Sequence, residues 1–191
     1  MPPLTRRELR QNTIKEVARR LFVENGFHAT GIAAIAKESR VAVQQLYRDF
    51  LSKEDIIAAI VTVDCERIAD QKTLNKALAA KDHAGIIGWL VATPCRKDDE
   101  GDRLFLEIAA EASRNERINR IFLDVRARMS ENVSRAFAGL MDSDVVADEH
   151  RTLAQAFMII SLGSVCARAL HKEDVEPARD RLIHCLIDGT R

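Results

Sequence analysis

Gln44 and Gln45, followed by Tyr47 and Arg48, lie in a segment where apolar spacing predicts a short helix. The glutamines fall on its outer face, where an amide presents a donor and an acceptor that match the edge of an adenine. Tyr47 and Arg48 suit phosphate oxygens, and the arginine also suits a guanine edge. These residue types indicate DNA contact. The alternatives are a solvated face for the glutamines and packing against the first helix for Tyr47.

Three further positions suit the phosphate backbone of DNA. Thr30 precedes a short helix as its expected N-cap, and the free amides at a helix N-terminus attract phosphate. Lys53 begins a later helix and can hold a second phosphate. Arg40 lies in the expected turn between the two short helices and is a third candidate phosphate contact.

The spacing of apolar residues predicts the helices that position these side chains. The first buries Ile14, Val17, Ala18, Leu21 and Phe22 and stops at Asn25-Gly26; the second buries Ile32, Ile35 and Ala36; the third is anchored by Leu46 and Phe50; a fourth starts at Ser52. The second and third helices are too short to build a core of their own. Such a pair presents its second helix outward, as in a helix-turn-helix.

Helical spacing continues through the rest of the chain. The expected segments are a continuation to about residue 80, a helix capped by Asp82 and ended by Thr93-Pro94, a loop over 96–102, a helix from Asp102 to near Asn115, a long helix over 118–140, and two last helices over 148–171 and 175–188. No segment alternates like a strand, so the fold class is all-α. We expect a three-helix DNA-binding domain over residues 1–52 and a larger ligand-binding and dimerisation domain over 53–191.

The distribution of charge and the cysteines indicate which partners and which cellular compartment to expect. The net charge is zero, but residues 1–55 hold ten basic and seven acidic side chains, which favours phosphate contact by the N-terminal part. The four cysteines form no CxxC pair and no apolar leader precedes them, so we expect a reduced cytoplasmic protein. Gln155 and Arg168 interrupt the longest apolar run, which argues against a membrane span.

A set of residues in the N-terminal part has a characteristic order and spacing: Leu21-Phe22, Gly26-Phe27, Thr30, Ile32, Ile35-Ala36, Val41, Leu46-Tyr47, Phe50 and Lys53-Glu54. Over about residues 10–60 their spacing resembles the N-terminal domain of tetracycline-repressor-like (TetR) transcriptional regulators. The resemblance implies an all-α homodimer that binds a palindromic operator and is released by a small-molecule inducer. Arg40 and Ala42 stand where the family usually has glycine and serine, and Val43 and Gln44 replace the usual lysine and glycine.

The last two helices, over residues 148–188, are apolar on more than one face. A helix that is apolar nearly all round must be covered nearly all round, and a body this small covers only one side of it. Gly163, Ser164 and Ala167 permit close approach of another helix. We therefore expect a homodimer built from these two helices of each copy. The alternative is that both helices lie at the centre of a monomeric core.

A ligand cavity is expected among aromatic residues of the C-terminal part. The candidates are Trp89, Phe105, Phe122 and Phe157, with Glu107 and Glu111 as polar anchors. The alternative is that the aromatic residues are ordinary core and that Arg114 neutralises Glu111 on an exposed face.

Enzymatic motifs are missing from the sequence. The five histidines form no metal-ligand spacing, and there is no glycine-rich phosphate loop, no nucleophile elbow and no nucleophile–base pair. We expect no catalytic residue, no metal and no cofactor. The remaining alternative is a helical protein-interaction module whose helix-turn-helix does not bind DNA.

Overall fold

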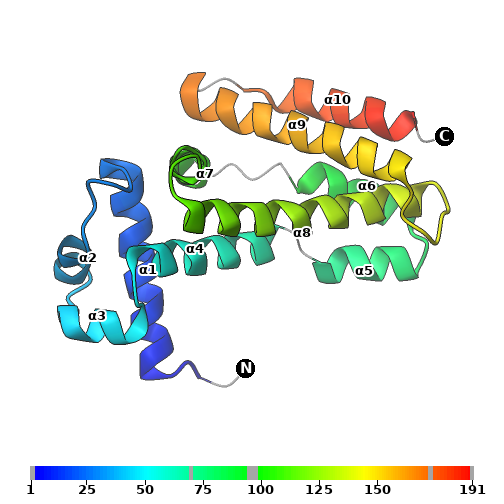
Figure 1. The fold of residues 1–191 in the computed structure, drawn as a ribbon. Coiled ribbons are helices and arrows are strands. Elements are labelled where there is room, and N and C mark those ends of the chain that lie inside the picture. Colours follow the sequence, from blue (N-terminus) through cyan, green and yellow to red (C-terminus); the bar gives the residue numbers. More distant parts are fainter. Residues whose placement is uncertain (1–2, 69–70, 94–98, 172–173, 190–191) are drawn as a thin grey trace. The chain divides into compact units, whose positions relative to one another are not determined.

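The computed structural model describes residues 3–68, 71–93, 99–171 and 174–189, and over these residues the chain forms ten helices and no strand (Figure 1). The helices are α1 (Arg6–Asn25), α2 (Ile32–Glu38), α3 (Val43–Asp49), α4 (Lys53–Ile68), α5 (Gln71–Ala79), α6 (His83–Ala92), α7 (Asp99–Ala112), α8 (Glu116–Leu140), α9 (Asp148–His171) and α10 (Glu176–Asp188). The all-α prediction is confirmed.

One helix boundary differs from the prediction. The helical stretch expected from residue 52 to about 80 is described as α4 and α5, and residues 69–70 between them lie outside the described residues. A loop is expected over 96–102, and its predicted C-terminal end is wrong, because α7 already begins at Asp99. Acidic residues such as Glu100 and Asp102 suggested a solvated loop, but they also stabilise the N-terminal turn of a helix. Cys95 and Pro94 lie outside the described residues.

The chain packs as two compact units. The first comprises Met1–Asp64 and Arg103–Leu123, and the second comprises Cys65–Asp102 and Asp124–Arg191. Helices α7 and α8 therefore each belong in part to both units. These units group residues by packing and do not test the functional boundary expected at residue 52, which stays a prediction.

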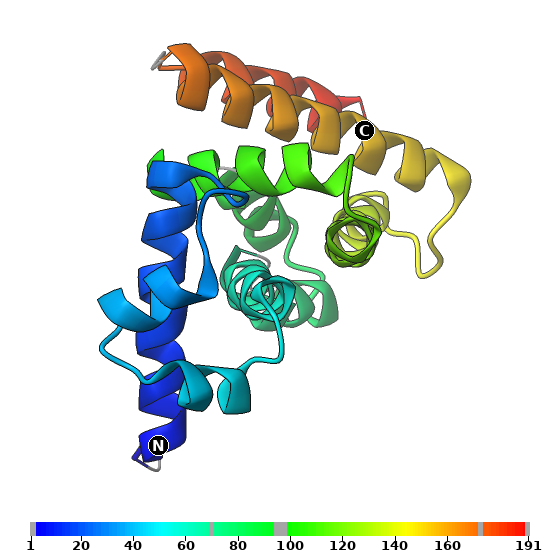
Figure 2. The ribbon, with the colours of Figure 1, turned by 60° about the vertical axis from the view of Figure 1, so that its left-hand side comes forward.

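The first unit is organised around α1, with α2 and α3 beside it (Figure 2). The apolar stripe of α1 is buried as its spacing predicts: Ile14, Ala18, Leu21 and Phe22. Thr5 and Glu8 form a capping box at its start, where the Glu8 amide donates to Thr5 Oγ1 at 3.2 Å and Thr5 N donates to Glu8 Oε2 at 2.7 Å. Gly26 ends α1 at φ 81, a conformation that glycine adopts without strain.

Arg40 occupies the left-handed region in the turn between α2 and α3, with φ 56. The turn is closed by hydrogen bonds from Arg40 N to the Lys37 carbonyl at 3.1 Å and from Val41 N to the Ala36 carbonyl at 2.9 Å. A residue with a Cβ in this conformation costs about 1–2 kcal/mol. The turn adopts this conformation without a glycine, and the surrounding packing carries the cost.

Ala42 is the N-cap of α3 and makes no side-chain cap hydrogen bond. Replacing it with serine is expected to raise the free energy of unfolding by about 1 kcal/mol, because the hydroxyl accepts from a free amide of the first turn. Urea unfolding followed by circular dichroism measures the change. Ala34→Ser, at an exposed position inside α2, is the control and is expected to lower stability by about 0.5 kcal/mol. An unchanged unfolding midpoint for Ala42→Ser would contradict this cap geometry.

The second unit has its own core. It is formed by α5, α6, the C-terminal part of α8, α9 and α10, and its buried residues include Leu74, Ile86, Trp89, Leu90, Val133, Phe137, Phe157, Ile183 and Ile187. Arg168 of α9 donates two hydrogen bonds to the carboxylate of Asp102, at 2.7 and 3.0 Å. Helices α9 and α10 lie side by side (Figures 1 and 2).

One face of α9 and α10 is not covered by the chain itself. Ile159 and Leu170 on α9 are 62% and 68% exposed, and Leu182 on α10 is 52% exposed. Among the described residues, α9 is the helix whose length and composition would allow it to cross a membrane, and only 17% of its most apolar stretch is buried. Isolated exposed apolar residues are ordinary, but several of them on two adjacent helices make this face a candidate contact surface.

Candidate nucleic-acid interface

Helix α3 presents a polar and partly apolar face outward because its opposite face is anchored. Leu46 is fully buried, and Phe50 at the C-cap is nearly so. Gln44 and Arg48 are exposed one turn apart, and Val43 and Tyr47 form a second exposed pair one turn apart. Tyr47 therefore does not pack into the core behind α1. The outward face of α3 carries three of the residues proposed to contact DNA.

Gln45 does not share this outward face. It is only partly exposed, and it lies one turn before Asp49, where it helps to keep the pKa of that carboxyl below its usual value. Of the two glutamines, Gln44 is the one that is free to approach a base.

Asp49 fixes the C-terminal end of α3 to α1. Its buried carboxylate accepts hydrogen bonds from Arg10 Nε at 2.5 Å and Arg10 Nη2 at 3.0 Å, and Arg7 Nε lies 3.5 Å away. The Asp49 carbonyl accepts from Gln11 Nε2 at 3.5 Å. The hydrogen bonds from Arg10 hold the pKa of Asp49 below its usual value against the opposing effect of burial. These contacts hold α3 in a fixed orientation against α1.

Replacing Asp49 with asparagine is expected to lower the free energy of unfolding at neutral pH by about 1.5–3 kcal/mol, the contribution of hydrogen bonds to a charged group. The pKa of Asp49 is depressed in the folded state, so its contribution is complete above the unfolded pKa and is lost as pH falls through the folded pKa. The difference between wild type and variant should therefore shrink as pH falls below about 4. Urea titrations from neutral to acid pH measure it.

Asp124→Asn is the control for this experiment, because Asp124 is an exposed aspartate on α8. It should leave the free energy of unfolding within about 0.5 kcal/mol of wild type at every pH. A full-sized loss for Asp49→Asn that persists in acid would show that the charge is not what stabilises the α1–α3 contact.

Thr30 is turned into the core and does not cap α2. Its hydroxyl donates to the carbonyls of Leu21 at 3.0 Å and Gly26 at 2.9 Å, and the N-cap of α2 is Gly31. The N-cap prediction for Thr30 is wrong. The hydroxyl is bound instead by carbonyls of the last turn and C-cap of α1, and sequence spacing does not reveal them.

Lys53 is also directed inward. Its ammonium donates to the carbonyls of Phe27 at 2.5 Å and Thr30 at 3.0 Å, and it lies 4.1 Å from the centroid of the Phe27 ring. Burial lowers the pKa of Lys53. The cation satisfies loop carbonyls and a ring face, a position that does not match the expected phosphate contact. Arg40 and Arg48 remain exposed.

The two glutamates expected in a ligand cavity instead contact the loop after α1. Glu107 Oε2 accepts a hydrogen bond from Phe27 N at 3.3 Å. Glu111 is buried, and its Oε2 lies 2.8 Å from His28 Nε2 and 3.5 Å from Arg114 Nη2. The spacing of four residues places both carboxylates on one face of α7. That face is fixed to the α1–α2 loop, within the first unit.

The aromatic residues expected around one cavity belong to different units. Phe105 and Phe122 form a tilted ring pair with centroids 5.6 Å apart in the first unit. Trp89 and Phe157 are buried in the core of the second unit. For these last two residues, the structure matches the alternative of ordinary core packing.

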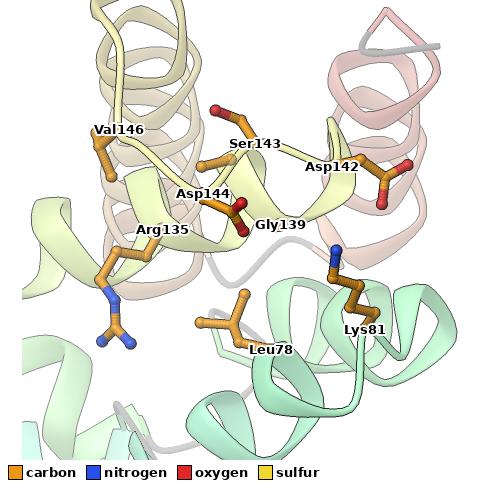
Figure 3. Close-up of a pocket in the computed structure, with 9 residues that line it drawn as sticks. Leu78, Lys81, Arg135, Gly139, Asp142, Ser143, Asp144 and Val146 are labelled. Carbon is orange, nitrogen blue, oxygen red and sulfur yellow. The ribbon is translucent and has the colours of Figure 1, made fainter.

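An open pocket of about 210 Å³ lies between the C-terminal ends of α5 and α8 (Figure 3). Lys81 and Arg135 border it together with Asp142 and Asp144, and none of the six expected ligand residues lines it. Arg135 Nη2 donates to Asn75 Oδ1 at 2.8 Å, and Asp142 Oδ1 lies 3.1 Å from His83 Nε2. Two of its charged groups are therefore already bound within the chain.

Sequence reasoning missed Arg10 and Asp49, although a signal for them exists. Asp49 is the one acidic residue of the third helix, and the start of the first helix is rich in arginine. A carboxylate that follows Leu46 by three residues also lies close to the buried side of the helix. Such an acid requires a cationic partner, and the adjacent helix supplies it.

Comparisons with known proteins agree with this geometry. Residues 14–60 match the family model described as bacterial regulatory proteins, tetR family. The HTH-type transcriptional regulator UidR of Escherichia coli is 26% identical over 165 residues, which is 85% of this chain and 82% of UidR.

Solved structures show the same fold. Salmonella enterica GusR superposes with a TM-score of 0.74 at 22% identity, over 97% of this chain and 98% of GusR. A TetR transcription regulator from Haloarcula marismortui superposes with a TM-score of 0.76 at 16% identity, over 94% of this chain and 97% of that protein.

Proposed function

This chain belongs to the tetR family of bacterial regulatory proteins, and we propose that it is a cytoplasmic repressor that binds a palindromic operator as a homodimer and leaves it when a small molecule binds. The family assignment makes it a DNA-binding helix-turn-helix transcriptional regulator and not an enzyme. Repression, dimerisation and inducer release are the proposed refinements.

DNA binding by α3 is supported by one observation above all. The helix is fixed from behind by Leu46, Phe50 and Asp49, and its opposite side exposes Gln44 and Arg48. A rigid support with an exposed polar face is what insertion into a major groove requires. We propose Gln44, Tyr47 and Arg48 as DNA contacts on α3 and Arg40 as a backbone contact, and we assign Thr30, Gln45 and Lys53 structural roles.

Operator affinity is expected to fall steeply with salt. A dimer that neutralises about four phosphates loses about 100-fold in affinity between about 50 and 200 mM salt. Arg48→Ala should flatten the salt slope by about one unit per bound domain, whereas Lys53→Met should leave it unchanged because that cation is directed inward. Gel-shift titrations on DNA selected from genomic fragments measure both slopes. An affinity independent of salt would favour the protein-interaction module.

A second copy of the chain is the proposed partner of α9 and α10. The exposed row includes Ile159, Leu162, Leu170 and Leu182. Gly163 lies among them, and a Cβ placed on it meets no atom of its own chain within 4 Å. Two such helices paired with their copies across a two-fold axis form a four-helix contact that buries this face.

Induction through α7 is the proposed route from ligand to DNA. This helix begins in the second unit and ends in the first, where Glu107 and Glu111 contact the loop between α1 and α2. A ligand that displaces α7 therefore acts directly on the DNA-binding unit. Helix α4, which leads from α3 into the second unit, is a parallel route.

A further inference from the structure

We propose that Val43 recognises the 5-methyl group of a thymine, beside an adenine edge bound by Gln44, so that the centre of each operator half-site consists of T·A pairs. This inference rests on the proposed DNA binding and specifies which bases the domain distinguishes. It follows from the position, exposure and chemistry of the first two residues of α3.

Val43 is placed where base contact is made. In a helix-turn-helix the N-terminal residues of the recognition helix approach the base edges, and Val43 is the first residue of α3. Its side chain is 42% exposed. The Ala42 carbonyl fixes the first turn by accepting from Gln45 N at 2.9 Å and Leu46 N at 3.0 Å. A valine in a helix is stiff at χ1, so little entropy is lost when it is fixed against DNA.

The chemistry of the side chain selects thymine. Valine has neither a donor nor an acceptor, and the apolar group that the major groove offers is the thymine methyl. Against cytosine, the same side chain would cover an amino group without giving it a partner, which is unfavourable. A methyl group buried against an aliphatic side chain changes affinity by about fourfold.

The neighbouring residues extend this selection. Val43 and Tyr47 are one turn apart on α3, and both are exposed. Gln44 lies beside Val43 and is exposed, whereas Gln45 is only partly exposed, so Gln44 is the amide placed to bind an adenine. Adenine and the thymine methyl are the two halves of a T·A pair, and both are presented in the major groove.

The test replaces thymines in the operator by deoxyuridine, which lacks only the 5-methyl group and keeps base pairing. The operator is first isolated by selection from genomic fragments, and affinities are measured by fluorescence anisotropy. One thymine per half-site is expected to show a loss of about fourfold when replaced, and replacement in both half-sites about 16-fold. In Val43→Ala the same replacements should change affinity by less than about twofold, because the methyl group has lost its contact.

Two matched variants separate the roles. Val63 on α4 is 44% exposed, nearly as much as Val43, and Val63→Ala should keep the full sensitivity to deoxyuridine. Gln44→Ala should also keep it, but should lose the sensitivity to 7-deazaadenine, a base that lacks an acceptor on the major-groove edge.

The outcomes distinguish this inference from the proposed function. An operator that binds with a steep salt dependence but tolerates deoxyuridine at every thymine would overturn thymine recognition and leave DNA binding intact. Sensitivity that persists undiminished in Val43→Ala would assign the methyl contact to another residue. A protein that binds no selected DNA would overturn both proposals.

Discussion

Replacing Gly163 with arginine is expected to leave the protein folded but monomeric at micromolar concentration, and to lower its operator affinity by about 100-fold or more. Gly163 lies on the uncovered face of α9, near Ile159 and Leu162, and the space beyond its Cα is open within its own chain. An arginine there would bury a cation in an apolar contact between copies, which is destabilising unless the cation is paired. Without the partner copy, the second DNA-binding domain no longer contributes to operator affinity.

Folding itself should not suffer, because arginine favours a helix by up to about 1 kcal/mol relative to glycine. Gly88→Arg on α6 is the matched control. It is also a helical glycine of the second unit whose added Cβ meets nothing within 4 Å, and we expect it to remain dimeric. Sedimentation velocity measures the mass, and circular dichroism verifies the fold. A dimeric Gly163→Arg, or a wild type that sediments as a monomer, would refute the proposed interface.

The helices and their buried faces were largely predictable because helical periodicity records burial directly. The stripe of α1 is buried as expected, and α9 has the bounds 148–171 that its apolar run predicts. On α4, Ile56, Ile57, Ile60 and Val61 face inward as their spacing predicts. A stripe at i, i+3 and i+4 has this consequence wherever the chain is helical.

Polar side chains were predicted less well, because their partners are distant in the sequence. Thr30 and Lys53 have the residue types of a helix cap and a phosphate contact, yet both bind carbonyls of the loop that follows α1. Glu107 binds the amide of Phe27, 80 residues away. The sequence indicates that such a polar side chain needs a partner. Whether that partner is a backbone group, a ligand or DNA depends on which groups the fold brings close to it.

Glutamine provides the sharpest example within the candidate interface. Gln44 and Gln45 are equivalent in type and adjacent in position, and sequence spacing placed both on the outer face of the helix. A rotation of 100° between neighbouring helical residues separates them, so Gln44 is exposed and Gln45 is only partly exposed, one turn before Asp49. The orientation of α3 that produces this difference is held by the buried Asp49–Arg10 pair, whose members are 39 residues apart in the sequence.

A small apolar or amphipathic ligand of the second unit is expected to lower operator affinity by about 5- to 150-fold, the range of typical coupling energies. Both DNA-binding domains of a dimer must meet successive major grooves about 34–36 Å apart, or a multiple of that spacing. A displacement of α7 acts on the α1–α2 loop through Glu107 and Glu111 and disturbs this spacing. By linkage, operator must weaken ligand binding by the same factor.

A thermal-shift screen identifies ligands, and operator titration at saturating ligand measures the coupling. Replacing Glu107 by alanine and Glu111 by glutamine should preserve ligand binding but reduce the coupling factor towards one, since α7 then loses its polar contacts with Phe27 and His28. Glu100→Ala is the control on the same helix, because Glu100 is exposed in the first turn. It should keep the coupling of wild type.

The two directions of coupling make this prediction decisive. If ligands stabilise the protein but leave operator affinity unchanged, the regulator is a constitutive DNA binder, and Phe105 and Phe122 are core residues like Trp89 and Phe157. If coupling is present and survives the loss of both glutamate contacts, α7 is not the route, and the signal passes through α4. Only a coupling that is reciprocal and depends on Glu107 and Glu111 supports release of the operator through α7.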